Sequence, residues 1–319
     1  MNRTQVLHRL KDVIRRKHFS YATEQAYCGW VDRYSRFVEC LDPTVPSEQK
    51  LESFVTMLAK QGVAASTQNQ AFNAIVFFYR EVISQKLGDV NGLRARREAT
   101  VRVAPSVDET RVLLDEIRDR HGYPTRLISL LLYGCGLRVS EPLNLRIKDV
   151  QLADSRLIIR GAKGGKDRVV SLPCSLVAPL KLKLKRARVI WEIDRENRVP
   201  VPLPGRLSKK YPGAPFARQW FWVIPALKTC RHPRTGETVR WRCHEANVQR
   251  AVKDAARKCG LDGLVTPHVL RHAYATHAMQ RGAFVRDVQS AMGHVSLETT
   301  MGYLHTEIGR VPSPLDAIA

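Results

Sequence analysis

The segment SRLIIRGAKGGKDRVVSLP, residues 155–173, constrains the fold most because it differs from the chain around it. Two short runs rich in Leu, Ile and Val flank a glycine-rich turn, which is the pattern of a β-hairpin. The segments on either side instead repeat apolar residues at helical spacing. The sequence therefore predicts a mainly α-helical protein with a small β-sheet.

Residues 1–88 form a first group of predicted helices. One runs through SYATEQAYCGWVDRYSRFV, with Ser20 as its N-terminal cap, and another through STQNQAFNAIVFFYREVI, with Ser66 as its cap. Aromatic and aliphatic residues recur along one face of each. The simplest interpretation of these faces is core packing, so this segment is expected to form a helical domain of its own.

Residues 89–105 are basic and lack a long apolar period. They are expected to link the first domain to a second, residues 106–319, and could lie along a phosphate backbone. The second domain opens with two predicted helices, SVDETRVLLDEI and TRLISLLLYGCG, and Gly134 and Gly136 end the latter. After the hairpin comes a long proline-rich stretch, and helices resume near Asn247.

The charge balance indicates the kind of partner. Lys and Arg number 52 against 30 Asp and Glu, a formal net charge of +22, and the basic residues are spread along the whole chain. Such a surface favours a polyanion, with nucleic acid the first choice over an acidic membrane or ribosome-like packing. No stretch approaches the ~20 apolar residues of a membrane span. Seven scattered cysteines and the absence of a signal-peptide pattern predict a cytoplasmic protein with reduced thiols.

The segment TPHVLRHAYATHA places two histidines at metal-ligand spacing, His268 and His272. Pro267 suits the first turn of a helix that Thr266 could cap, and Arg271 shares a face with both histidines. An arginine would repel a metal cation, and no Asp or Glu occurs between positions 266 and 286. An anion site fits this face best, and a packed histidine pair remains the alternative.

Four further residues could act with this face. Arg138 follows the two glycines in YGCGLRVSEPLNL, and Lys163 lies in the glycine-rich hairpin turn, which could equally be an exposed basic tip. His294 and Tyr303 lie in MGHVSLETTMGYLH. A tyrosine hydroxyl becomes a useful nucleophile only where cationic neighbours stabilise its phenolate. The basic residues named above would supply such neighbours.

Taken in order, these residues resemble the active-site set of the tyrosine recombinases, the phage-integrase family. The resemblance implies that the tyrosine attacks a DNA phosphodiester, that the two arginines and the histidine after Gly293 hold its oxygens, and that the lysine protonates the leaving group. It also implies that the first histidine assists the tyrosine and that a neighbouring glutamate orients the set. The residues concerned are Arg138, Glu141, Lys163, His268, Arg271, His294 and Tyr303.

The resemblance carries further expectations. Residues 1–88 would be a SAM-like core-binding domain and residues 106–319 the catalytic domain, together forming a C-shaped clamp on DNA. Four protomers would assemble on two recombination sites. A covalent phosphotyrosyl link conserves the bond energy, so no metal, ATP or other cofactor is expected.

The chain between Lys163 and His268 is longer than simple family members require, and residues 190–245 resemble the insertion of integron integrases. The likeness lies in the motif KKYP, in the run rich in Trp and Pro, and in the start of the helix HE…QRAV. It implies integration and excision of gene cassettes at double-stranded and folded single-stranded DNA sites, with extruded bases stacked on aromatic residues. The candidate DNA contacts are Trp220, Trp222, Trp241 and His244 in the insertion, and Lys166 and Arg168 in the hairpin.

One departure and three alternatives accompany this interpretation. Trp241-Arg242-Cys243-His244 stands where integron integrases tend to have a His-rich stretch. A phage-type or chromosome-dimer-resolving recombinase is the first alternative, and the insertion speaks against it. A non-catalytic DNA-binding protein of the same fold is the second, and the intact Tyr303 speaks against that. A metal-dependent nuclease is disfavoured because the basic cluster has no carboxylate partners.

Overall fold

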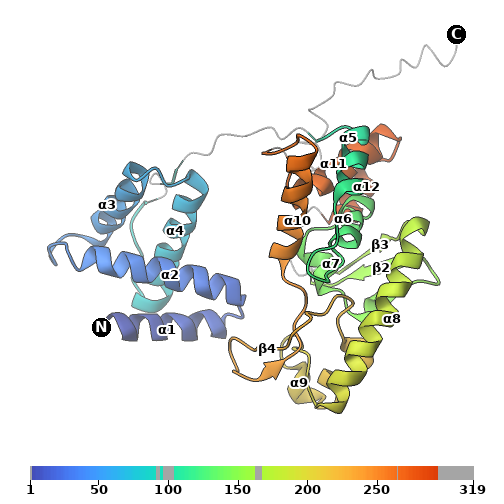
Figure 1. Cartoon of the computed structure of the whole chain (residues 1–319). Helices are drawn as coiled ribbons and strands as arrows, with labels where there is room; N and C mark the ends of the chain where they lie inside the picture. The colour runs from blue at the N-terminus through green and yellow to red at the C-terminus, as the bar shows by residue number, and fades with distance from the viewer. Residues whose placement is uncertain (1, 91–93, 96–103, 162–166, 264, 294–319) are drawn as a thin grey trace, which may run out of the picture. The chain divides into compact units, whose positions relative to one another are not determined.

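The computed structural model describes residues 2–90, 94–95, 104–161, 167–263 and 265–293 (Figure 1). The chain divides into two compact units, Met1–Thr100 and Val101–Ala319. The point of division falls within the basic segment 89–105, where the sequence lacks the apolar periodicity that a packed helix needs.

The first unit is a group of helices: α1 (Arg3–Arg16), α2 (Tyr21–Val38), α3 (Ser47–Lys60) and α4 (Ala65–Phe78), followed by a π-helical turn, Tyr79–Ile83. Their apolar faces meet in one core that includes Leu10, Val31, Phe54 and Phe72. The aromatic faces seen in the sequence thus serve packing, in agreement with the simplest interpretation.

The helix starts in this unit follow the sequence only in part. Ser20 accepts a hydrogen bond from the Thr23 backbone and caps α2 as predicted. Ser66 does not cap α4, because the helix begins at Ala65 with Ala64 in the cap position and no side-chain cap. Ser66 therefore lies inside the first turn.

The second unit is built on α5 (Val107–Glu116), α6 (Thr125–Gly134), α10 (Glu245–Lys258) and α11 (Pro267–Gln280), with α12 (Val285–Met292) packed against α11. Ser106 and Glu109 form a capping box that starts α5, within the segment where the sequence predicts a helix. Buried residues of α5, α6, α10 and α11 share one core, in which Leu113, Leu131, Val252 and Leu270 are fully buried. α6 lies in contact with both α10 and α11 and is the central helix of this unit.

The predicted hairpin is present at the edge of that core. β1 (Val150–Gln151), β2 (Arg156–Ile159) and β3 (Arg168–Ser171) form an antiparallel sheet in the order β1-β2-β3. Ile159 pairs with Arg168 at the end nearest the glycine-rich turn. Leu157, Ile159 and Val170 face the core, as the period of two requires. The mainly helical fold with a small sheet is therefore confirmed.

The proline-rich region is more ordered than the sequence suggested. Its first part is α8 (Cys174–Glu196), a 23-residue helix that we did not predict. The apolar face is hard to recognise because Lys183 takes one of its buried positions and Pro179 interrupts the pattern. Beyond α8 lie the short helix α9 (Leu207–Lys210) and a two-stranded sheet of β4 (Cys230–Arg231) and β5 (Thr238–Val239). Within the described residues, no helix is both long and apolar enough to span a membrane.

Candidate active site

Arg138 is held at the junction between α6 and the short helix α7 (Ser140–Asn144). Its backbone N–H donates to Oε2 of Glu141 at 2.8 Å, and its Nη1 donates to Oε1 of the same carboxylate at 3.0 Å. Nη2 also donates to the Gly293 carbonyl at 3.3 Å. The side chain is 24% exposed, so a ligand can reach a guanidinium that the protein already orients.

Arg271 comes to the same place from α11. Its side chain is only 1% exposed, and its two Nη atoms donate to the carbonyls of Gly136 and Met292, each at 2.6 Å. Gly136 adopts φ +61°, and a Cβ there would lie 2.5 Å from ring atoms of Tyr274. This position thus requires glycine for two independent reasons, conformation and close approach.

Glu141 lies between the arginines and is 7% exposed. Arg168 donates to both of its oxygens, from Nη1 at 2.8 Å and from Nη2 at 2.7 Å. Nη1 of Arg271 lies 3.8 Å from Oε2. Burial opposes ionisation of Glu141, but the hydrogen bonds and positive charge of Arg168 outweigh it and hold the pKa below its ordinary value.

The C-terminal end of α12 completes the cluster. The carbonyls of Ala291, Met292 and Gly293 accept hydrogen bonds from Arg168, Arg271 and Arg138 respectively. Carbonyl oxygens at a helix C-terminus carry partial negative charge and favour cations nearby. Three guanidinium groups against one carboxylate leave an excess of positive charge. Oriented donors with such an excess suit a phosphate.

The histidines of α11 lie on the same helix as Arg271. The rings of His268 and His272 meet edge to face, with centroids 4.8 Å apart. His268 is exposed, whereas His272 is half-buried. The two histidines therefore pack against each other, and Arg271 on the same helix is held by two backbone carbonyls.

The structure brings together Arg138, Glu141 and Arg271 of the predicted catalytic set, and His268 lies three residues before Arg271 on α11. The other predicted members, Lys163, His294 and Tyr303, lie outside the described residues, as does the predicted DNA contact Lys166. Arg168, which we expected to contact DNA, instead directs its guanidinium into protein.

In the insertion, Trp222 is unsuited to stacking an extruded base, contrary to our expectation. The residue is 5% exposed, and its Nε1 donates to the Arg240 carbonyl at 3.0 Å. The Arg146 guanidinium lies over the ring, 3.0 Å from the centroid. Because protein covers this indole, Trp222 serves packing.

The other predicted contacts of the insertion are more accessible. Trp220 is half-buried, with the Lys148 ammonium 3.0 Å from its ring centroid. Trp241 is also half-buried and lies tilted against His232, with centroids 5.3 Å apart. His244 is exposed and caps α10, since its Nδ1 accepts the Ala246 N–H at 3.1 Å.

A buried ion pair joins Arg240, near the end of the insertion, to Asp194 in the last turns of α8, and nothing in the sequence indicated it. Arg240 donates to both carboxylate oxygens of Asp194, at 2.7 and 2.6 Å, and to the carbonyls of Ala226 and Leu227. Arg146 similarly donates to the carbonyls of Trp220 and Pro202. The two arginines thus donate hydrogen bonds to backbone carbonyls of the insertion. These bonds satisfy carbonyls in a segment that has few helices and strands.

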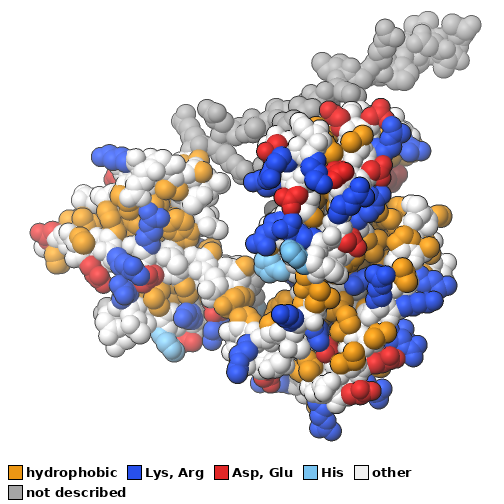
Figure 2. Space-filling model, viewed as in Figure 1, with side chains coloured by type: hydrophobic (Ala, Val, Ile, Leu, Met, Phe, Trp, Pro, Cys, Tyr) orange, Lys and Arg blue, Asp and Glu red, His pale blue; other side chains and the backbone are white. Residues whose placement is uncertain are grey.

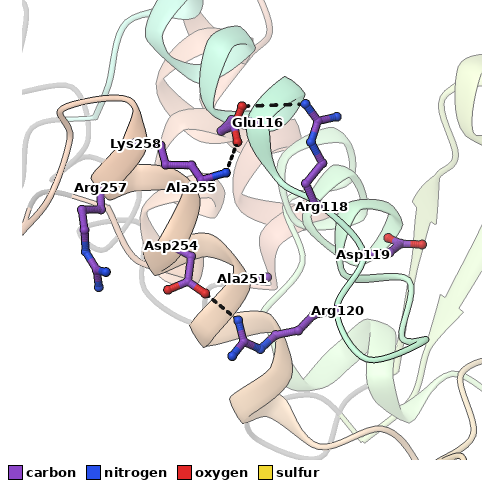
Figure 3. A pocket seen from close by; sticks show the side chains of 9 residues that line it. All are labelled: Glu116, Arg118, Asp119, Arg120, Ala251, Asp254, Ala255, Arg257 and Lys258. Atoms are coloured by element: carbon purple, nitrogen blue, oxygen red, sulfur yellow. Dashed lines mark hydrogen bonds and ion pairs between the residues drawn. The ribbon is translucent and has the colours of Figure 1, made fainter.

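Among the residues that the structure describes, the other charged groups do not form a comparable site. Lys and Arg side chains are spread over both units on the visible face rather than gathered in one patch (Figure 2). A hollow between the end of α5 and α10 is lined by opposite charges that pair with each other (Figure 3). In it Lys258 contacts Glu116 at 2.7 Å, and Arg120 contacts Asp254 at 2.5 Å. Because these charges neutralise one another, the hollow is a poor site for an anion. The arginine cluster is therefore the better candidate for the active site.

Comparison with known families identifies both parts of the chain. The family model described as "Phage integrase family" matches residues 106–309, and "Phage integrase, N-terminal SAM-like domain" matches residues 6–89. The chain belongs to the phage integrase family, the tyrosine-type site-specific recombinases, which are enzymes that cleave and rejoin DNA. The predicted class of enzyme and the two predicted kinds of domain are confirmed.

Individual relatives extend over most of the chain. An "Integrase/recombinase" of Escherichia coli is 38% identical over 319 residues, covering 98% of this chain and 94% of the relative. The tyrosine recombinase XerD of Agrobacterium fabrum is 31% identical over 270 residues, covering 80% of this chain and 75% of the relative. A lambda integrase dimer bound to a core site superposes with a TM-score of 0.64 at 15% identity, covering 94% of each chain, which shows the shared fold.

Proposed function

We propose that this protein is an integron-type recombinase, which integrates and excises gene cassettes through a 3′-phosphotyrosyl intermediate. The observation that carries the chemistry is the convergence of Arg138 and Arg271 on Glu141 and the end of α12. Two oriented guanidiniums can bind both non-bridging oxygens of one phosphate and stabilise the charge that grows on them during attack.

In the proposed reaction, the Tyr303 oxygen attacks the scissile phosphorus while the bond to the 5′-oxygen breaks. Lys163 gives a proton to that oxygen, which leaves as a 5′-hydroxyl, and His268 assists removal of the tyrosine proton. His294 adds a hydrogen bond to the phosphate. A 5′-hydroxyl of a partner strand then attacks the phosphotyrosine and restores Tyr303. Because one phosphodiester replaces another, the cycle needs neither ATP nor a metal.

The remaining parts have proposed roles in DNA binding. Residues 1–88 would bind the recombination site as a core-binding domain, residues 89–105 would link it, and residues 106–319 would carry out the chemistry. Four protomers would act on two sites in the cytoplasm. The family models that match residues 6–89 and 106–309 support this division.

The integron assignment depends on the insertion at residues 190–245. Trp220 and Trp241 are both half-buried and each lies beside a cationic or imidazole group, Lys148 and His232. An indole with a part-exposed face can stack an unpaired base that projects from a folded single strand. Exposed His244 at the start of α10 could add a hydrogen bond.

A Xer-type recombinase acting on duplex sites is the second candidate. The observation that favours it is the likeness to tyrosine recombinase XerD over 80% of this chain. The two candidates share the same chemistry, but they differ in whether a folded single strand or a plain duplex is the better substrate.

The test uses a folded single-stranded cassette-type hairpin nicked near the cleavage point, a matched duplex and a chelator. The expected result is a covalent protein–DNA band on a denaturing gel, stronger with the hairpin and absent for Tyr303→Phe. Equal or stronger reaction of the duplex would favour the Xer-type function. Tight binding without a covalent band on either DNA would refute the proposed chemistry.

A further inference from the structure

Arg168 joins three elements of the active site. It stands at the start of β3, where its side chain is 10% exposed. Its two Nη atoms donate to the two oxygens of Glu141 in α7, and its Nε donates to the Ala291 carbonyl of α12 at 2.7 Å. All three nitrogens of this guanidinium are therefore engaged within the protein.

We propose that Arg168 is a positioning residue for DNA cleavage and acts through Glu141 to keep Arg138 available to the scissile phosphate. This proposal rests on the proposed function, since it concerns the phosphate that Tyr303 would attack. It replaces the expectation that Arg168 contacts DNA directly.

The hydrogen-bonding capacity of Glu141 explains how Arg168 acts. Each carboxylate oxygen offers about two lone-pair directions. Arg168 occupies one on each oxygen; Oε1 also accepts Nη1 of Arg138, and Oε2 its backbone N–H. The carboxylate can thus hold only one edge of the Arg138 guanidinium. Nη2 of Arg138 donates one N–H to the Gly293 carbonyl at 3.3 Å, and its second N–H can meet an incoming phosphate.

Loss of Arg168 would change how Glu141 shares its hydrogen bonds between the two arginines. The freed lone pairs of Glu141 would draw the Arg138 guanidinium into a two-point ion pair, the favoured geometry for these groups. The local charge would also fall, because one of three guanidiniums is lost while the carboxylate remains. Both changes weaken the grip on a phosphate.

The shape of the site makes an arginine necessary. A Cβ on Gly293 would lie 3.1 Å from Cδ of Arg168, so the side chain passes close to the residue that precedes His294. A lysine keeps the charge but has a single ammonium. It cannot reach both oxygens of Glu141 and the Ala291 carbonyl together.

The first test measures single-turnover cleavage of the nicked site with saturating Arg168→Met and Arg168→Lys proteins. Arg156→Met is the matched control, because Arg156 lies on β2, is exposed and pairs there through its backbone. We expect Arg168→Met to cleave about 100-fold more slowly, the scale of a misplaced catalytic group, with Kd for the same DNA changed by less than about threefold. Arg168→Lys should recover only a small part of the rate, and Arg156→Met should cleave at the wild-type rate.

A double variant separates positioning from general structural damage. In Glu141→Gln/Arg168→Met, the amide cannot capture Arg138 as an ion partner, and the charge of the cluster returns to its original value. This double variant should cleave faster than Arg168→Met alone, a strong coupling between the two positions. The proposal would be overturned if the double variant slowed cleavage by the product of the two single-variant effects. It would also be overturned if Arg168→Lys cleaved as fast as wild type.

A second arm needs no cleavage and separates failure of this inference from failure of the proposed function. The full-length protein without DNA is treated with p-hydroxyphenylglyoxal, and modification of Arg138 is followed by peptide mass spectrometry. Capture of Arg138 by Glu141 should slow its modification at least about threefold in Arg168→Met but not in Arg156→Met. Unchanged modification would overturn the inference even if wild type cleaves no site.

Discussion

Replacing Gly136 by alanine would test how tightly the active-site arginines depend on the packing beneath them. The backbone there has φ +61°, which costs a residue with a Cβ about 1–2 kcal/mol. The new methyl would also lie 2.5 Å from Cδ1 and Cε1 of Tyr274. Overpacking of this kind costs about 1–3 kcal/mol, so we expect a total loss of about 2–5 kcal/mol.

A control isolates the clash from the conformational cost. Gly260 has φ +70°, and a methyl group added there would meet no atom within 4 Å, so Gly260→Ala should lose only about 1–2 kcal/mol. Urea unfolding followed by tryptophan fluorescence suits the comparison, because four of the five tryptophans lie in the second unit. In a Tyr274→Ala background, Gly136→Ala should cost no more than the control.

The same substitution should lower activity, because the Gly136 carbonyl accepts a hydrogen bond from Arg271 at 2.6 Å. A displaced carbonyl would move the guanidinium and slow cleavage more than DNA binding. If Gly136→Ala and Gly260→Ala lost equal stability in the native background, the close approach of Tyr274 would not be the constraint, and this reasoning would fail.

Three shorter predictions follow. Arg240→Met should leave Asp194 as an unpaired buried charge and cost about 3–5 kcal/mol in urea unfolding, whereas a change below about 1 kcal/mol would show that the pair does not fix the insertion. Burial raises the pKa of the Cys135 thiol to about 12, so iodoacetamide at pH 8 should label exposed Cys40 well before Cys135, as read by peptide mass spectrometry; equal labelling would contradict this. Because the folded-state pKa of Glu141 is lowered, its charge stabilises the fold above the ordinary carboxyl pKa of about 4.3, and this contribution is lost as pH falls through the lower folded value. The stability difference between wild type and Glu141→Gln, from urea titrations at several pH values, should therefore shrink as the pH is lowered, and a constant difference would refute the assignment.

Local patterns predicted a large part of the fold. The hairpin was recognisable because two β-rich runs flank a glycine-rich turn, and β2 and β3 pair as expected. The helix α5 was predicted from SVDETRVLLDEI, and its start is stabilised by a capping box of Ser106 and Glu109 within one turn. Such features depend on residues close in sequence.

Other elements depend on partners far along the chain and could not be predicted. The face of α8 includes Lys183, which its own sequence marks as exposed. Trp222 has the residue type of a stacking platform, but Arg146 and the Arg240 carbonyl cover it in the fold. Neither partner can be inferred from the spacing around the tryptophan.

The sequence by itself determined the chemistry that this chain can offer: a strongly basic surface and arginines, histidines and a tyrosine in a fixed order. Those properties belong to residue types and their order, which no folding step changes. Only the tertiary structure decided which groups share a carboxylate. Glu141 contacts Arg138 three residues away but also Arg168, and the carbonyls at the end of α12 bring Arg271 to the same point. Packing of distant elements sets these contacts, and it gives Arg168 an inward-facing role that its place in a basic hairpin did not suggest.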